Sequence, residues 1–304
     1  MVIDFEALRA DGSWRLTWVD GRLDEAVFRA VPETADGRRA LVEALGADAS
    51  DPERWEAALV EALLVDPVSV GLRRLELHLT DFHHSARRAA SAVATYRREQ
   101  LSELYFGHDF EFLYENAQTS TGGWIDPEKH LADGFVGEAG AGFWAALPAL
   151  RELTVEGAAL FDDIDGAVLG NLTDLRLRGA VLAGGEVLPG RAPSVVTLVL
   201  DLESDVHGVA CPVELLDELD PARFPGLRHL DLGRVEFDAG DVEILAALAG
   251  SAIVPRLESL TIRQLVVADH DVEAVGRSVD AFAHLRLSAA GAGAVEPDGV
   301  LPAT

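Results

Sequence analysis

The residues best suited to chemistry are grouped in one short stretch, which contains His78, Asp81, His83, His84, His108 and Asp109. Imidazole and carboxylate side chains bind zinc and serve as acid and base in enzymes. His83 and His84 are adjacent at a predicted helix start and should point apart, whereas His78 falls on the exposed face of a predicted strand. A shared coordination sphere is therefore not implied, and we expect a solvated surface cluster with no metal site.

Cys211 is the only cysteine, so the chain cannot form an internal disulfide, which favours a reducing cytoplasmic location. It directly precedes Pro212 at a predicted helix start. Partial burial as a small hydrophobic residue explains it better than a role as a nucleophile. An effector or enzyme that uses Cys211 or the His78/His108 cluster remains a less favoured alternative.

Other motifs are incomplete. Residues 137–142 are rich in glycine but lack the spacing of a dinucleotide-binding loop, and residues 162–166 resemble a calcium loop with apolar residues at two ligand positions. The chain contains no GxSxG, HExxH, CxxC or GxxxxGK[ST] motif. We therefore expect no catalytic residues, no cofactor and no bound metal.

The charge balance narrows the classes of partner. The 304 residues carry 25 basic and 52 acidic side chains, a formal net charge of −27. Binding to nucleic acid or to an anionic membrane needs a basic surface, so neither is expected. The longest charge-free stretches, 139–150 and 244–255, are too short to cross a bilayer.

A single pattern, apolar-x-x-apolar-x-apolar, positions most of these residues and recurs from Leu72 onward. Its eight copies begin at Leu72, Leu101, Leu150, Leu172, Val195, Leu227, Leu257 and Phe282. The alternation within each copy predicts one short strand with a buried and an exposed face. Amphipathic helical segments are predicted between the strands, at 85–98, 162–169, 212–219, 238–248 and 269–279.

With motifs such as LRELTVEGAAL, LTDLRLRGAVL and LRHLDLGRVEF, residues 72–290 resemble the leucine-rich repeat family. The layout is similar to that of cytoplasmic leucine-rich repeat proteins of bacteria. The resemblance implies an α/β solenoid, with a curved parallel sheet on the concave face and helices on the convex face. The chain lacks the regular asparagine ladder of the family, which favours an irregular solenoid.

Three segments fall outside the regular repeat. Residues 1–71 contain an alternating strand at Trp14–Trp18 and helix signals at 37–45 and 52–65, and we interpret them as an N-terminal cap or, alternatively, a separate recognition domain. The insert at 107–149 carries aromatic residues, among them Trp124, and is either an exposed anchor for a partner or a degenerate repeat. Residues 291–304 are a C-terminal tail.

We expect a noncatalytic protein-interaction module that is monomeric in isolation and binds an unidentified protein through the exposed strand positions. Tyr and Arg, both enriched at interface hot spots, occur among these positions. The predicted partner-binding residues are Arg74, Glu76, His78, Tyr105, Glu152, Arg176, Arg178, Asp231, Arg263 and Arg286, with Trp124 in the insert. An alternative interpretation is that Arg178 does not bind a partner and only neutralises the charges of Glu156 and Asp201. A structural subunit of a larger assembly is the alternative function.

Overall fold

The structure is a computed structural model that describes residues 8–9, 12–29, 40–43, 52–79, 86–108, 140–157, 169–180, 188–203, 210–263 and 272–290. The chain divides into two compact units, Met1–Ala167 and Val168–Thr304. Both units combine helices with mostly parallel strands, so the predicted α/β class is confirmed. Within the described residues, no helix is both long and apolar enough to cross a membrane.

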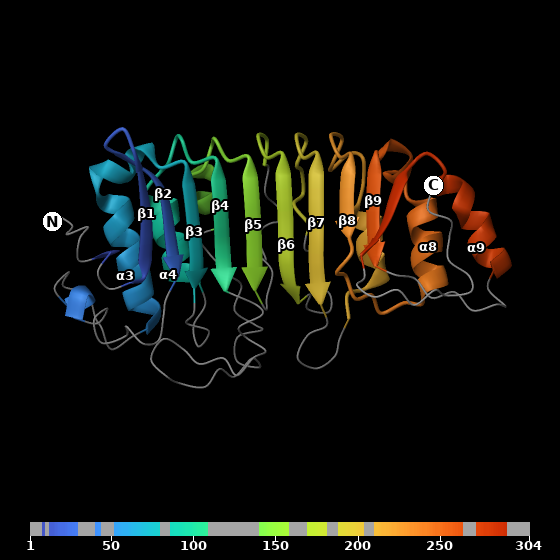
Figure 1. The fold of residues 1–304 in the computed structure, drawn as a ribbon, viewed down its shortest axis with the longest axis horizontal. Helices are drawn as coiled ribbons and strands as arrows, with labels where there is room; N and C mark the ends of the chain where they lie inside the picture. Colours follow the sequence, from blue (N-terminus) through green and yellow to red (C-terminus); the bar gives the residue numbers. More distant parts are fainter. Residues whose placement is uncertain are drawn as a thin grey trace. The chain divides into compact units, whose positions relative to one another are not determined.

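The first unit places five strands side by side in the order of the sequence (Figure 1). Its elements are β1 (Trp14–Val19), β2 (Arg22–Arg29), α3 (Pro52–Val65), η2 (Pro67–Gly71), β3 (Arg74–Leu79), α4 (Arg87–Thr95), β4 (Glu103–His108), α7 (Gly140–Ala145) and β5 (Glu152–Gly157). Strands β2 to β5 are parallel, and β1 is antiparallel to β2. In Figure 1, α3 and α4 lie behind these strands.

The β1–β2 hairpin is a feature that the repeat pattern did not predict. Asp20 and Gly21 form the turn with φ angles of 50° and 77°. An Asp-Gly pair with two positive φ angles is typical of tight hairpin turns. The strand predicted around Trp14 is confirmed, whereas β2 was missed although the Asp-Gly pair could have indicated it. Because β2 pairs with β3, the N-terminal segment is continuous with the sheet of the first unit.

The core of the first unit follows the repeat register. Leu75 pairs with Leu104 and Leu104 with Leu153, and all three side chains are buried. In β3 the buried leucines alternate with the less buried Arg74, Glu76 and His78. This alternation places apolar side chains on one face and polar side chains on the other, as a period of two requires.

The second unit also contains five strands in chain order. Its elements are β6 (Asp174–Ala180), β7 (Thr197–Glu203), η4 (Val213–Glu218), β8 (His229–Leu232), α8 (Asp241–Gly250), η5 (Val254–Arg256), β9 (Ser259–Arg263), α9 (Val272–Val279), η7 (Asp280–Phe282) and β10 (Arg286–Ala290). All these strands are parallel. The buried row Leu175, Leu198, Leu230 and Leu260 is in register. All eight repeat strands predicted from Leu72 onward are therefore present.

The helix predictions have mixed outcomes. Helix α3 has the predicted bounds, and α4, α8 and α9 lie within or overlap the segments predicted at 85–98, 238–248 and 269–279. The segment at 212–219 forms a 3-10 helix rather than an α-helix, since Leu215 N donates to Pro212 O, three residues back, at 3.1 Å. Of the segment at 37–45, residues 40–43 are helical. The helix predicted at 162–169, the calcium-like loop at 162–166 and the tail at 291–304 lie outside the described residues, apart from residue 169.

Candidate functional site

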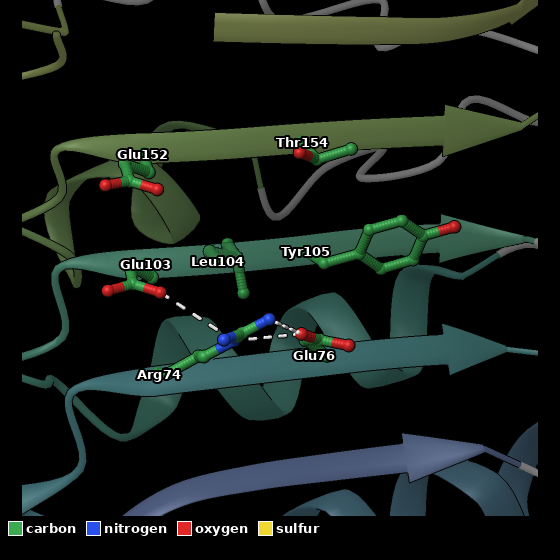
Figure 2. A pocket seen from close by; sticks show the side chains of 7 residues that line it. All are labelled: Arg74, Glu76, Glu103, Leu104, Tyr105, Glu152 and Thr154. Carbon is green, nitrogen blue, oxygen red and sulfur yellow. Dashed lines mark hydrogen bonds and ion pairs between the residues drawn. The ribbon is translucent and has the colours of Figure 1, made fainter. Parts of the chain in front are cut away.

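The polar face of β3, β4 and β5 contains a hollow of about 200 Å³ (Figure 2). Its lining residues are Arg74, Glu76, Glu103, Leu104, Tyr105, Glu152 and Thr154. Apart from Leu104, whose side chain points into the core, they share this face because residues two apart on a strand lie on the same side and the three neighbouring strands are in register. Arg74, Glu76, Tyr105 and Glu152 were predicted from the sequence as binding residues, and the structure brings all four together.

Arg74 is the cation of this hollow. Its Nε donates to Glu76 Oε1 at 2.9 Å, its Nη2 also donates to that oxygen, and its Nε lies 3.7 Å from Glu103 Oε2 (Figure 2). The hydrogen bonds to Glu76 raise the pKa of Arg74. Burial alone would raise the pKa of Glu76, but hydrogen bonds from His78 and Arg74 outweigh it, so the pKa is lowered. The ion pair is therefore charged at neutral pH.

His78 extends this network along β3. Its Nε2 lies 2.9 Å from Glu76 Oε2, and its Nδ1 lies 3.3 Å from Nη2 of Arg29 on β2. A guanidinium group can only donate, so Nδ1 accepts and Nε2 carries the hydrogen donated to Glu76. The imidazole also stacks on the Tyr105 ring, with centroids 3.9 Å apart and an interplanar angle of 23°. His78 is thus fixed on three sides.

Tyr105 connects β4 to the end of β5. Its hydroxyl donates to Glu156 Oε2 at 2.5 Å, and Glu156 is only 3% exposed. Gly107 pairs with Glu156 and has a φ angle of 147°. A Cβ atom at Gly107 would lie 1.8 Å from the backbone oxygen of Glu156. Glycine is therefore required where the two strands approach each other beside Tyr105.

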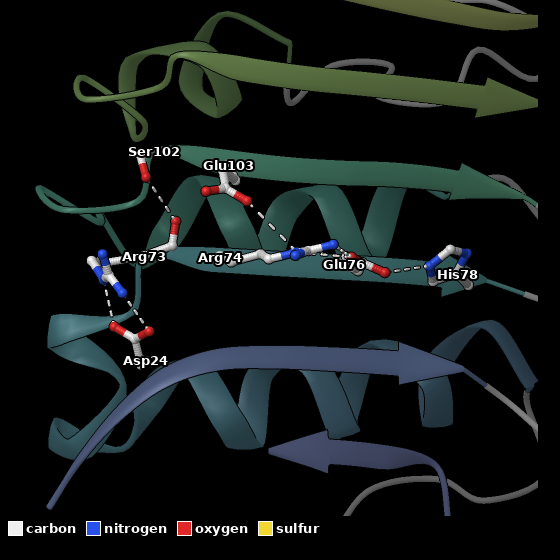
Figure 3. A network of polar contacts seen from close by, with 7 residues as sticks. All are labelled: Asp24, Arg73, Arg74, Glu76, His78, Ser102 and Glu103. Atoms are coloured by element: carbon white, nitrogen blue, oxygen red, sulfur yellow. Dashed lines mark hydrogen bonds and ion pairs between the residues drawn. The ribbon is translucent and has the colours of Figure 1, made fainter. Parts of the chain in front are cut away.

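A second ion pair borders the same face (Figure 3). Arg73 donates to both carboxylate oxygens of Asp24 on β2, at 2.5 and 2.6 Å. These hydrogen bonds lower the pKa of Asp24. The backbone oxygen of Arg73 accepts from the hydroxyl of Ser102 at 3.3 Å. Strands β2, β3 and β4 are thereby joined through side chains as well as through the sheet.

The lining of the hollow is acidic overall, with three glutamates and one arginine. The side chain of Glu103 is 41% exposed, and Glu152 is exposed. Glu152 has no ion-pair partner within the part of the chain that the structure describes. Because β4 and β5 pair Glu103 with Glu152, two like charges occupy directly opposite positions. Such a pair is destabilising unless a cation lies nearby.

The predicted residues of the second unit are arranged differently. Arg176 donates to Asp201, and Nε of Arg178 lies 3.9 Å from the same carboxylate, which is 4% exposed. The interpretation that Arg178 neutralises Asp201 is therefore supported. Asp231 accepts a hydrogen bond from the backbone of Gly233 at 2.8 Å. Arg263 is exposed at the end of β9, and the side chain of Arg286 lies outside the described part.

The remaining candidates do not form a site among the described residues. Cys211 is fully buried, and burial, with smaller effects from Asp238 and Glu218, raises its pKa to about 12. The prediction of partial burial was thus too weak. The backbones of Cys211 and Phe237 also pair in a β-bridge. The described residues contain no group of three or more histidine, cysteine or acidic side chains that could hold a metal ion. Trp124, His83, His84 and the side chain of His108 lie outside the described residues.

Three residues that support the hollow were not predicted from the sequence. Arg29 and Asp24 belong to the unpredicted strand β2, and their contacts with His78 and Arg73 each span 49 residues of sequence. The Asp20-Gly21 turn was the available signal for that strand. Gly107 was missed because its role comes from the close approach of Glu156 across the sheet, for which one strand pattern carries no signal.

The comparisons with known proteins bear on the fold alone. No family model and no curated protein matches the sequence. The structure resembles the crystal structure of a protein from Bacteroides fragilis, with a TM-score of 0.50 and 18% sequence identity. The match covers 76% of this chain and 64% of the Bacteroides protein, so the chain spans less than two thirds of that protein's length. At 18% identity, the match shows a similar fold and gives no information about an activity.

Proposed function

We propose that this chain is a noncatalytic protein-binding module of the leucine-rich repeat type, and that its partner contacts the polar face of β3, β4 and β5. The repeat assignment is supported by eight copies of the motif, each of which forms a strand in the predicted place. The observation that carries the binding proposal is the hollow lined by Arg74, Glu76 and Tyr105. Concave surfaces of repeat proteins commonly bind other proteins.

The side chains around the hollow are held in fixed positions by their contacts, which supports a binding role. Tyr105 is fixed by stacking on His78 and by its hydrogen bond to Glu156. Arg74 is fixed by Glu76. Side chains that are already immobile lose little conformational entropy when a partner binds, which favours affinity. Tyr and Arg are also the residue types that dominate interface hot spots.

The chemistry of the described residues favours binding over catalysis. Cys211 is buried, and its pKa near 12 leaves it almost entirely as the thiol at neutral pH. Both ring nitrogens of His78 are engaged by Glu76 and Arg29. A general base needs a free nitrogen within reach of its substrate. We therefore propose that the histidine network positions Tyr105 and does not transfer protons.

The experiment begins with affinity capture from a lysate of the source organism, followed by measurement of Kd for the purified partner. Tyr105→Ala should weaken binding at least tenfold, as expected for truncation of an interface anchor worth about 2 kcal/mol. Arg277→Ala, a change at an exposed position of α9 that was not predicted to bind, is the control and should bind as wild type. Equal binding by wild type and folded Tyr105→Ala would contradict the proposed surface.

One observation favours the second candidate, a structural subunit of a larger assembly. Strand β1 is the first strand in the sheet order, and its Trp18 and Val19 are 40% and 48% exposed. Exposed edge strands with apolar side chains can pair with another chain. Light scattering across a range of protein concentrations tests this, with Trp18→Glu as the variant. A larger wild-type mass that Trp18→Glu reduces to a monomer would favour assembly through β1.

A further inference from the structure

We propose that the partner inserts a cationic side chain, from an arginine or lysine, into the hollow between Glu103, Glu152 and Tyr105. This inference rests on the proposed protein-binding function and identifies the chemistry of the group that is bound. Three observations carry it: the charge of the hollow, the opposed glutamates in its lining and the ion pair of Arg74 with Glu76.

The opposed glutamates need a positive charge that the described residues do not fully supply. Glu103 and Glu152 face each other across β4 and β5. Arg74 approaches Glu103 only to 3.7 Å, and Glu152 has no ion-pair partner among the described residues. A cation placed between the two carboxylates would relieve their repulsion and gain two attractive contacts.

Arg74 is not free to fill this role. Both Nε and Nη2 of its guanidinium group bind one oxygen of Glu76, which fixes the head group on β3. Its charge is therefore largely compensated by Glu76. The lining of the hollow has a formal net charge of −2, because it contains three glutamates and one arginine. Arg74 then acts as a weak internal competitor for the carboxylate of Glu103.

The remaining lining suits a long side chain rather than a small cation. Tyr105 and Thr154 also line the hollow, and the Tyr105 ring and the Thr154 methyl group provide partly apolar walls, whereas the side chain of Leu104 lies in the core on the opposite face. Arginine and lysine place an aliphatic stem against such walls while the charged head group contacts carboxylates. No group of three or more histidine, cysteine or acidic side chains in the described part is arranged so that it could hold a metal ion. The net charge of −27 also attracts basic partners over a distance.

The test starts from random heptapeptides selected on the immobilised wild-type protein, with binding then measured by fluorescence anisotropy. The selected peptides should contain arginine or lysine. Replacement of the key arginine by its neutral isostere citrulline, or of a key lysine by acetyl-lysine, should weaken binding about tenfold, as should the Glu103→Gln/Glu152→Gln double variant. Glu258→Gln/Glu273→Gln removes two exposed carboxylates from the second unit and is the matched control, which should bind as wild type.

Arg74→Gln gives the sharpest distinction. If the partner brings a cation, removal of the internal competitor should tighten binding about two- to fivefold, in line with the modest strength of partly exposed ion pairs. If the partner brings an anion to Arg74, this variant should lose binding, and the inference is overturned. Circular dichroism of each variant confirms that it is folded before binding is compared.

The remaining outcomes separate this inference from the proposed function. If the selected peptides lack basic residues but require Tyr105, the inference of a cationic group is overturned, whereas the proposed protein-binding surface is still supported. Peptides that bind equally well to wild type and Tyr105→Ala would count against both the inference and the proposed surface. Selection of no Tyr105-dependent peptide would likewise count against both.

Discussion

The hydroxyl of Tyr105 donates a 2.5 Å hydrogen bond to Oε2 of Glu156, a residue that is 3% exposed. The bond joins strands β4 and β5 on the polar face, 51 positions apart in the sequence. It provides a hydrogen-bond donor for a buried carboxylate and also fixes the ring that lines the hollow. Stability and the shape of the candidate site are therefore coupled at this pair.

Tyr105→Phe should separate these two roles. The ring and its stacking on His78 remain, but the hydrogen bond to Glu156 is lost. We expect a loss of about 1.5–3 kcal/mol in the free energy of unfolding, as for a hydrogen bond to a charged group. Urea denaturation followed by circular dichroism measures the change. A variant as stable as wild type would show that the bond contributes nothing net.

Gly107→Ala should be among the most disruptive single changes in the first unit. The φ angle of 147° is costly for alanine, and its Cβ would lie 1.8 Å from Glu156 O. The expected loss is about 3 kcal/mol or more, since backbone strain and steric overlap act together. Gly71→Ala is the control, because no atom lies within 4 Å of a Cβ placed there. Similar melting temperatures for the two variants would contradict the strand approach at Gly107.

Asp24 should make the free energy of unfolding depend on pH in the acidic range. Hydrogen bonds from Arg73 lower the pKa of Asp24 in the folded protein. Its contribution is therefore fully present above the ordinary aspartate value of about 3.9 and is lost as the pH falls through the lower folded value. Asp24→Asn should be less stable than wild type by a constant amount at neutral pH, and the difference should shrink below about pH 4. Thermal melts across this range measure it, and a difference that grows in acid would contradict the ion pair.

Leu175→Asp should unfold the second unit. Leu175 is 1% exposed and lies in register with the buried Leu198. Burial of an unpaired carboxylate and loss of the leucine side chain should together exceed about 4 kcal/mol. Asp174→Ala, at the adjacent exposed position, should cost about 1 kcal/mol or less. Circular dichroism distinguishes the two, and a folded Leu175→Asp would mean that this row is not part of the core.

Cys211 should be unreactive in the native protein. It is fully buried, and its pKa is raised to about 12, so thiolate is scarce at pH 8. A thiol-specific disulfide reagent should modify it slowly under native conditions and at once in denaturant. Rapid native modification would reopen the nucleophile hypothesis.

The local alternation of apolar and polar residues was sufficient to predict the strands of the repeat. Each motif such as Leu150/Leu153/Val155 alternates buried and exposed positions, and this period is a property of the extended backbone itself. It also assigned Arg74, Glu76 and Tyr105 to one face. The α/β class and the buried row in the second unit followed from the same information.

Contacts across strands were decided only by the tertiary structure. Arg29 reaches His78 across 49 positions and Tyr105 reaches Glu156 across 51, so neither pair is visible in a local window. The same holds for Gly107, whose requirement comes from the backbone of another strand. The sequence by itself determined which residues share the polar face, because side-chain alternation is local, but it did not show that Glu156 and Asp201 on that face are buried. Which of them pair, and which charges stay available for a partner, depends on strand register and close packing, and these are set by the whole fold.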